Sequence, residues 1–384
     1  MRGLSQALFF ASLAFSLYTV AGYPLLLALW ARLRSRPVYR KFTTRAITVL
    51  LPVRNGERWL RAKLESLLAI EYPAEQFQIL VISDGSTDGT EAIAAEYAAA
   101  GKIELLCIPS GGKAAALNAG IERARGEILF FTDVRQALAP DSLRNLVACF
   151  ADPSVGAASG ELVIREGETR EELSIGLYWT YEKWLRKRES RIDSVMGATG
   201  CIYAMRRELA VPLPAGTLVD DMFLPLAAFF RGYRVILDET AIAFDYPTAL
   251  DAEFRRKVRT QAGVYQIMTL YPEILTPRNR MWFTFVSHKL ARLLLPFAFL
   301  LAAATTAALG EPWRTSAIAV QALFYGLALA DWWIPSGFFG KRLSGPLRSF
   351  VVLLAAALCA PFVLLRPAGS VWKDTQVRSA RTLP

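Results

Sequence analysis

Histidine is almost absent from this chain of 384 residues, which contains only His288. The imidazole side chain is the most frequent general acid or base in enzymes because its charge changes near neutral pH. A single histidine beside an apolar stretch argues against histidine-based catalysis. We therefore expect any general base to be a carboxylate, a lysine or a tyrosine.

Cysteine is also scarce, and the four cysteines are scattered without a CxxC pair. They are Cys107, Cys149, Cys201 and Cys359. Structural disulfides belong to oxidising compartments, and zinc sites need closely spaced ligands. This distribution fits a reducing compartment and argues against a zinc site.

Charged residues are missing from Gly3 to Ala31. As a helix this stretch would be ~40 Å long at ~1.5 Å per residue, enough to cross a ~30 Å hydrocarbon core. The alternative is a cleaved signal peptide, whose apolar region is only ~7–15 residues long and ends in a small-residue cleavage site. No convincing site of that kind follows, so we expect residues 1–31 to form an N-terminal transmembrane helix.

A basic juxtamembrane linker follows over residues 32–45. It contains six basic residues and no acid: Arg32, Arg34, Arg36, Arg40, Lys41 and Arg45. Positive charge next to a membrane helix marks the cytoplasmic side, where anionic membrane lipids are the simplest partner. Because much of the formal net charge of +10 lies here, we expect no nucleic-acid partner.

Three further apolar stretches predict C-terminal transmembrane helices over residues 290–366, followed by a tail over 367–384. The stretches are Leu293–Gly310, Thr315–Trp333 and Ser349–Leu365. Lys341, Arg342 and Arg348 suit a cytoplasmic loop, but four spans would then place the basic tail outside. This conflict leaves open whether one stretch lies in the membrane interface. The expected location is the inner (plasma) membrane, multi-pass, with the catalytic domain in the cytoplasm.

Two stretches with helical spacing combine aromatic and basic residues, Glu171–Arg191 and Asp251–Tyr271. Such a pattern is typical of a helix lying in the membrane interface, and equally of a surface helix that packs on a sheet. We assign residues 249–289 to interfacial helices.

Between the apolar segments, residues 46–248 alternate short apolar runs with helical stretches. The runs Ala46–Val53, Phe77–Ser83, Lys102–Ile108, Glu127–Thr132 and Ala157–Ile164 are expected strands, and Trp59–Ile70, Thr90–Ala100 and Lys113–Arg125 expected helices. This alternation predicts an α/β domain with a mostly parallel sheet, covered on both faces and binding its ligand at the carboxyl ends of the strands.

Three aspartates lie where strands or loops open into such a site: Asp84, Asp133 and Asp221. Each has a structural alternative. Asp84 starts an ordinary strand-to-helix turn, Asp133 could pair with Arg135, and Asp221 could favour a helix N-terminus. A cluster of acids is costly unless a cation joins it or one member acts as a base.

Lys113 follows two glycines at an expected helix start in the segment SGGKAAALNAG. Backbone N–H groups and an ammonium at such a place suit a phosphate, although the spacing is not that of a P-loop. By itself the motif is weak.

The order of seven motifs resembles that of the membrane-bound family 2 glycosyltransferases, which include cellulose, chitin, hyaluronan and poly-N-acetylglucosamine synthases. The motifs are LLPVRNGE, SDGSTDGT, GGKAAALNAG, FTDVRQ, GATGCIYAMRR, LVDDM and RRKVRT. The resemblance covers roughly Ile47 to Gly263. It implies a GT-A fold, Rossmann-like, inserted between transmembrane helices.

The resemblance also implies roles for individual residues. Asp221 would be the catalytic base and Asp133 the ligand of a Mg²⁺ or Mn²⁺ ion. Nucleotide-sugar contacts would come from Pro52, Val53, Asn55, Asp84, Lys113, Asp133 and Arg259. Acceptor contacts would come from Ala198, Thr199, Gly200, Cys201 and Asp220.

Two motifs depart from the family pattern. The family's Asp-x-Asp is Asp133-Val134-Arg135 here, so the second carboxylate is missing and Arg135 could neutralise phosphate. The Gln-x-x-Arg-Trp motif of processive synthases keeps only Arg259, since Arg256 and Thr260 hold the outer positions. Processive polymerisation is therefore in doubt.

We expect an inverting, metal-dependent membrane glycosyltransferase that moves a sugar from a nucleotide-sugar to a growing exopolysaccharide or lipid-linked glycan. The expected donor is a UDP-sugar. Partner subunits of a polysaccharide assembly system are compatible with this function. The alternatives are a polyprenyl-phosphate monosaccharide transferase and a non-catalytic nucleotide-binding subunit of an export complex.

Overall fold

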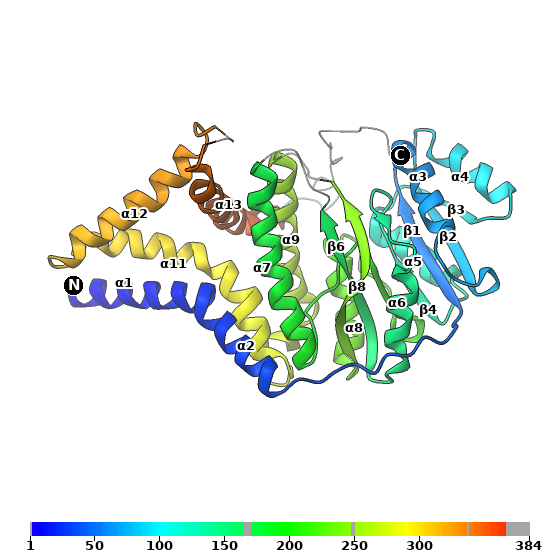
Figure 1. The fold of residues 1–384 in the computed structure, drawn as a ribbon, viewed down its shortest axis with the longest axis horizontal. Coiled ribbons are helices and arrows are strands. Elements are labelled where there is room, and N and C mark those ends of the chain that lie inside the picture. Colours follow the sequence, from blue (N-terminus) through cyan, green and yellow to red (C-terminus); the bar gives the residue numbers. More distant parts are fainter. Residues whose placement is uncertain (1, 165–169, 247–249, 336–337, 366–384) are drawn as a thin grey trace. The chain divides into compact units, whose positions relative to one another are not determined.

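The protein is represented by a computed structural model that describes residues 2–164, 170–246, 250–335 and 338–365. The predicted tail over 367–384 lies outside these residues. The chain divides into two compact units (Figure 1). Of the described residues, unit 1 comprises 2–34, 170–188, 250–335 and 338–365, and unit 2 comprises 35–164 and 189–246.

Unit 2 is an α/β unit whose first half follows the predicted alternation of strands and helices. Its strands are β1 (Ile47–Val53), β2 (Phe77–Asp84), β3 (Glu104–Ile108), β4 (Ile128–Phe131), β5 (Ala137–Leu138), β6 (Val155–Ile164), β7 (Tyr203–Arg206) and β8 (Arg234–Asp245). Its helices are α3 (Glu57–Leu68), α4 (Thr90–Ala99), α5 (Lys113–Arg123), α6 (Ser142–Ala148) and α8 (Asp220–Phe230).

The strands form one eight-stranded sheet in the order β3-β2-β1-β4-β7-β6-β8-β5. The strands β1 to β4 pair in parallel, as predicted, but β7 is antiparallel to both β4 and β6. The sheet as a whole is therefore mixed rather than mostly parallel. The pairing of β7 with β4 joins segments about seventy residues apart, which a local apolar pattern does not encode.

Both faces of the sheet are covered, because successive side chains of a strand point to opposite faces. Val49 and Leu51 of β1 belong to the same buried cluster as residues of α3 and α6. On the other face, Gly120 of α5 lies so close to Leu50 and Ile82 that an added Cβ would be 3.0 Å from each side chain. Burial on both faces explains why the strands are apolar without alternation.

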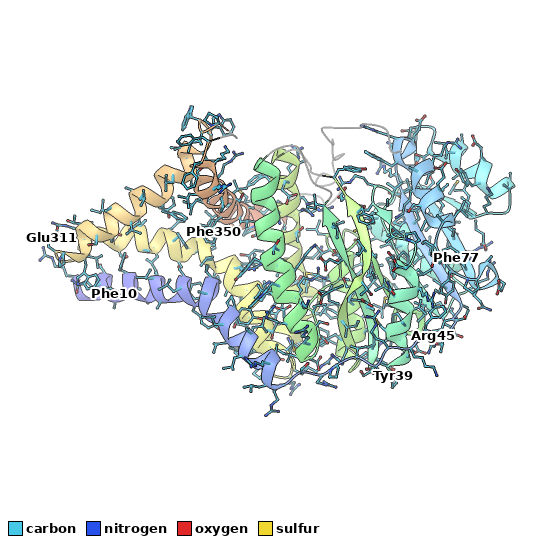
Figure 2. The ribbon with its side chains drawn as sticks, in the orientation of Figure 1. Phe10, Tyr39, Arg45, Phe77, Glu311 and Phe350 are labelled. Carbon is cyan, nitrogen blue, oxygen red and sulfur yellow. The ribbon has the colours of Figure 1, made fainter. Side chains whose placement is uncertain are left out.

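The linker after Arg34 has no helix or strand up to Ala46, and it runs along unit 2 (Figures 1 and 2). Its backbone is held at two places: the Arg36 N–H donates to the Arg191 carbonyl at 2.7 Å, and the Lys41 N–H to the Ala148 carbonyl at 3.1 Å. Three of its side chains form ion pairs, Arg36–Asp193 (2.7 Å), Arg40–Asp238 (2.7 Å) and Arg45–Glu127 (3.4 Å). Half of the six cations predicted to face anionic lipid are thus engaged by the protein's own carboxylates.

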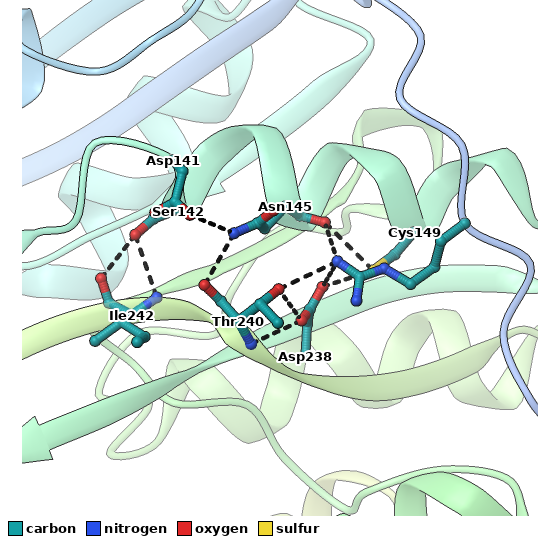
Figure 3. Close-up of polar contacts among 8 residues, drawn as sticks. Asp141, Ser142, Asn145, Cys149, Asp238, Thr240 and Ile242 are labelled. Atoms are coloured by element: carbon teal, nitrogen blue, oxygen red, sulfur yellow. Dashed lines mark hydrogen bonds and ion pairs between the residues drawn. The ribbon is translucent and has the colours of Figure 1, made fainter.

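The acceptor of Arg40, Asp238, belongs to a polar network that joins α6 to β8 (Figure 3). Asn145 donates to the Thr240 carbonyl at 2.9 Å, and Ser142 donates to the Ile242 carbonyl at 2.7 Å. The Cys149 thiol lies 3.2 Å from Asp238, and its burial together with that carboxylate raises its pKa. All four cysteines are free thiols in the structure.

Unit 1 is helical. Its elements are α1 (Arg2–Leu17), the π-helical turn η1 (Tyr18–Gly22), α2 (Tyr23–Leu33), α7 (Arg170–Ile192, which extends into unit 2), α9 (Leu250–Leu270), α10 (Trp282–Thr284), the π-helical turn η6 (Phe285–Leu290), α11 (Ala291–Thr305), α12 (Trp313–Ala330) and α13 (Lys341–Val363). Aromatic side chains join them: Phe10 packs on Trp313, and Phe350 packs on Phe299. Figure 2 labels Phe10 and Phe350.

Three stretches of the described residues are long and apolar enough to cross a membrane: Arg2–Leu33, Trp282–Ala308 and Lys341–Val363. They contain the predicted N-terminal helix and most of the first and third C-terminal stretches. The second, Thr315–Trp333, forms α12 but is not among the three candidates.

The lone histidine is buried in a charged cluster within unit 1. Glu182 of α7 lies 3.2 Å from both His288 Nε2 and Lys289 Nζ, and it also pairs with Arg292. Burial alone would raise the pKa of Glu182, but Lys289, Arg292 and His288 hold it well below its usual range. His288 thus has a structural partner, in line with the expectation that catalysis relies on other groups.

Candidate active site

The turns that follow β1 and β2 are tied together at the carboxyl edge of the sheet. Asn55 has a φ of 49°, a left-handed conformation that asparagine tolerates better than most residues. Its Oδ1 accepts a hydrogen bond from the Thr87 N–H at 2.8 Å. Pro52 and Val53 precede this turn, with Val53 buried. Their contact with a nucleotide base stays a prediction.

Asp84 ends β2 and shapes the glycine turn of the next strand–helix connection. Its carboxylate is 3% exposed and accepts hydrogen bonds from the Gly111 N–H (2.6 Å) and the Gly112 N–H (3.0 Å). These two amides, which the sequence suggested for a phosphate, therefore bind the protein's own carboxylate. The structure gives Asp84 a role in holding the turn before Lys113, and its contact with a nucleotide stays a prediction.

Lys113 is the first residue of α5 and the centre of an acidic cluster. Its Nζ lies 3.0 Å from Asp133 Oδ1 and 3.2 Å from Asp220 Oδ1. Burial would lower the pKa of Lys113, but Asp133, Asp220 and Asp221 outweigh it and raise that pKa. The structure therefore brings together four predicted site residues, from three separate motifs, and keeps the ammonium charged.

Asp133 follows β4, and its partner is Lys113 rather than Arg135. The Arg135 guanidinium instead pairs with Asp245 of β8 at 2.5 Å, and Gln136 Nε2 donates to the same carboxylate at 2.9 Å. Arg135 thus anchors the segment that carries Asp133. The sequence-based idea that Arg135 neutralises a phosphate has no support from this geometry.

Asp220 and Asp221 open α8, as the structural alternative predicted. The Asp221 carbonyl accepts a hydrogen bond from the Ala198 N–H at 2.7 Å. An added Cβ at Gly200 would come within 3.0 Å of Asp221 Oδ2, so the carboxylate lies directly against this glycine. The predicted acceptor segment and the predicted base are therefore neighbours, and the helix N-terminus stabilises the carboxylate as well.

The other two predicted acceptor residues, Thr199 and Cys201, form hydrogen bonds that hold the turn around Gly200 in place. The Thr199 N–H donates to Ser159 Oγ at 2.8 Å. The Cys201 carbonyl accepts a hydrogen bond from Thr132 Oγ1 at 2.8 Å, and burial raises the pKa of the Cys201 thiol. Cys201 is 4% exposed, so its side chain supports the site from behind and does not face an acceptor in this state.

Arg259 lies on α9 in unit 1, whereas the other predicted site residues all lie in unit 2. Its role towards a diphosphate stays a prediction.

Sequence analysis missed two buried residues behind the site, Lys63 and Tyr203. Lys63 shares the buried face of α3 with Leu60, Leu64 and Leu67, a pattern visible in the sequence as a charge at an apolar position. Tyr203 is fully buried on β7 and stacks on Phe131 at 4.4 Å between ring centroids. Nothing in the apolar sequence around Tyr203 distinguishes it from ordinary core.

The cluster suits a divalent cation held by few protein ligands. Three carboxylates and one ammonium give the group formed by Asp133, Asp220, Asp221 and Lys113 an excess of negative charge. The Tyr203 hydroxyl beside it has no hydrogen-bond partner among the described residues, and burial and the same carboxylates raise its pKa well above the usual value. Among the described residues no three histidine, cysteine, aspartate or glutamate side chains are placed to hold one metal ion, so these carboxylates do not form a complete ligand set by themselves. Mg²⁺ prefers one or two carboxylates completed by phosphate and water, and Asp133 fits that role.

Comparison with known proteins agrees with this arrangement. The family described as Glycosyl transferase family 2 matches residues 48–211, and Glycosyl transferase family group 2 matches residues 135–361. The chain is 25% identical over 282 residues to a beta-monoglucosyldiacylglycerol synthase of Nostoc sp., covering 69% of this chain and 58% of the relative. It is 26% identical over 255 residues to an N-acetylglucosaminyltransferase of Mesorhizobium japonicum, covering 61% and 59%. The chain therefore spans less than two thirds of each of these relatives.

A similar solved structure is the mannosyltransferase PcManGT from Pyrobaculum calidifontis, determined in complex with GDP-Man and Mn²⁺. The TM-score is 0.72 at 24% identity, and the match covers 95% of this chain and 98% of that one. At this identity the likeness shows the fold alone, and it confirms the predicted GT-A class.

Proposed function

Because the chain belongs to glycosyl transferase family group 2, we propose that it transfers a sugar from a nucleotide-sugar to an acceptor hydroxyl with inversion at the anomeric carbon. One observation carries this proposal: Asp133, Asp220 and Asp221, from two distant motifs, converge on Lys113 at the carboxyl edge of the sheet. That edge is where open α/β sheets bind their ligands.

Asp221 acts as the general base. It removes the proton of the acceptor hydroxyl while the acceptor oxygen forms a bond to the anomeric carbon. The bond between that carbon and the diphosphate oxygen breaks, and the nucleoside diphosphate leaves with the electron pair. The absence of a side chain at Gly200 keeps the space beside the Asp221 carboxylate open. Base catalysis of this kind contributes about 10²–10⁴ in rate.

Lys113 and Asp133 act on the leaving group. Asp133 would hold the cation, and Lys113, whose Nζ lies 3.0 Å from Asp133 Oδ1, stabilises the negative charge of the departing diphosphate. A bound Mg²⁺ or Mn²⁺ supplies charge neutralisation to the diphosphate. Arg259 is proposed to add a further positive charge from unit 1. The Mn²⁺ bound to the mannosyltransferase with the same fold supports the choice of cation.

The acceptor is proposed to be a growing exopolysaccharide or a lipid-linked glycan at the cytoplasmic face of the inner membrane. The three candidate membrane spans of unit 1 support a membrane-borne acceptor. The names of the relatives, a glucosyldiacylglycerol synthase and an N-acetylglucosaminyltransferase, support sugar transfer without fixing the sugar. Partner subunits of a polysaccharide assembly system remain compatible with this scheme.

The test is nucleotide release by the full chain in nanodiscs. A panel of UDP- and GDP-sugars is supplied with Mn²⁺ or Mg²⁺, with and without diacylglycerol, polyprenyl phosphate or a membrane lipid extract. We expect release with one donor, stimulation by one acceptor, loss on adding EDTA and recovery with excess Mn²⁺. No release with any donor and any acceptor would contradict the proposal.

A further inference from the structure

Lys63 is a lysine buried where an apolar residue would be expected. It is 2% exposed, and its Nζ donates to Thr132 Oγ1 at 2.7 Å and to the Gln136 carbonyl at 2.6 Å. Among the described residues it forms no ion pair. An ammonium without a carboxylate is costly to bury, and this burial lowers the pKa of Lys63 to about 7. A function other than packing would account for its presence.

The two acceptors of Lys63 bracket the short segment that carries Asp133. Thr132 precedes Asp133 directly, and Gln136 follows it by three residues. One side chain from α3 thus joins both ends of the segment 132–136. Its two bonds need only two N–H groups, so a neutral amine can make them as well as an ammonium.

The same bonds extend to the acceptor side of the site. The Thr132 hydroxyl that accepts from Lys63 donates to the Cys201 carbonyl at 2.8 Å. Cys201 follows Gly200, against which the Asp221 carboxylate lies. The other end of the segment is anchored separately, by Arg135 and Gln136 on Asp245. The side chain of Asp133 itself is 39% exposed.

We propose that Lys63 is a positioning residue that clamps the segment 132–136, so that the single carboxylate of Asp133 can hold the cation without a second aspartate at position 135. This inference rests on the proposed function, and it explains why Lys63 is retained in an apolar face. A residue that orients a metal ligand typically changes metal affinity by about 10–100-fold when it is replaced.

The test compares Lys63→Met, which keeps the length but removes both bonds, with Lys63→Arg and with the matched control Lys102→Met at an exposed lysine. Two properties are measured in each full-length variant: hydrogen exchange of the amides of residues 132–136, and Mn²⁺ affinity by electron paramagnetic resonance in the presence of nucleoside diphosphate. We expect Lys63→Met to speed exchange in this segment and to weaken Mn²⁺ binding by about tenfold or more. Lys102→Met should change neither, and Lys63→Arg should restore part of the protection.

Unchanged hydrogen exchange at residues 132–136 in Lys63→Met would contradict the proposal that Lys63 orders this segment. Faster exchange with unchanged Mn²⁺ affinity would contradict the proposal that this order supports cation binding. If the parent binds no Mn²⁺ with any nucleoside diphosphate, the proposed function fails and the clamp with it, while the exchange data still show whether Lys63 orders the segment. Should Lys63→Met fail to fold, Thr132→Val removes one of the two Lys63 bonds, together with the bond from Thr132 to the Cys201 carbonyl, and must give the same pair of changes.

Discussion

The ion pair between Arg135 and Asp245 gives a quantitative test of the role assigned to Arg135. The side chains of Arg135 and Asp245 are 17% and 8% exposed. Arg135→Ala would leave the Asp245 carboxylate buried, with the Gln136 amide and the Tyr246 N–H as its remaining hydrogen-bond donors among the described residues. Removing one member of a buried pair costs about 3–5 kcal/mol, because the remaining charge has lost its compensation.

We expect the lower end of that range, about 3 kcal/mol, since two hydrogen bonds to Asp245 survive. For a unit of this size, each kcal/mol shifts the melting temperature by about 2–4 °C, so Arg135→Ala should melt roughly 6–12 °C earlier. The assay is thermal unfolding followed by tryptophan fluorescence in detergent. The matched control is Arg61→Ala, which breaks the exposed pair with Glu96 and should cost less than about 1 kcal/mol.

The double variant Arg135→Ala with Asp245→Asn should recover most of the lost stability, because no buried charge is left without a partner. An Arg135→Ala shift no larger than that of Arg61→Ala would refute the structural role. A normal melting temperature with weakened nucleotide binding would instead show that Arg135 acts on the phosphates.

Three further predictions concern buried groups. Tyr203→Phe removes a buried hydroxyl that lacks a hydrogen-bond partner among the described residues while keeping the ring stacked on Phe131. We expect the melting temperature to rise by the equivalent of about 1 kcal/mol, and a fall would show that the hydroxyl forms a hydrogen bond. Folded Lys63 loses its proton near pH 7, whereas in the unfolded chain it keeps the proton to about pH 10.5. The parent should therefore gain stability over Lys63→Met between pH 7 and pH 10, by up to about 1.4 kcal/mol per pH unit, and a parallel pair of curves would contradict this. Glu182→Gln removes the carboxylate charge that pairs with Lys289 and Arg292 in unit 1; we expect a loss of about 3 kcal/mol, and an unchanged melting temperature would contradict the cluster's role.

The sequence predicted those helices and strands that depend on neighbouring residues alone. Residue type and hydrophobic periodicity indicated β1 to β4 and the helices between them, and the structure places these elements within a few residues of the expected bounds. The rule that parallel strands end on one side of a sheet predicted that Asp84 and Asp133 lie at one edge, and the structure places Asp84 at the end of β2 and Asp133 just after β4. The ion pair between Lys113 and Asp133 was not predicted from the sequence.

Partners distant in the chain could not be predicted in this way. The sequence suggested that Arg135 either pairs with Asp133 or neutralises phosphate, because its partner in the structure, Asp245, lies 110 residues away and has no motif of its own. The antiparallel position of β7 beside β4 and the ion pairs of the linker likewise join residues that are far apart in the sequence, so hydrophobic periodicity gives no sign of them. The family motifs suggested a role for Asp221, which stays a proposal, and only the structure shows that its carboxylate lies against Gly200.

The central claim is that Asp221 takes the proton of the acceptor while Asp133 and Lys113 bind the donor diphosphate. The most direct measurement is nucleotide release by Asp221→Asn, with Mn²⁺-dependent nucleotide binding measured on the same preparation. We predict that binding stays within about twofold of the parent while release falls by about 10²-fold or more. Turnover left largely intact in Asp221→Asn would contradict the account and would favour an acceptor that is already anionic, such as a polyprenyl phosphate.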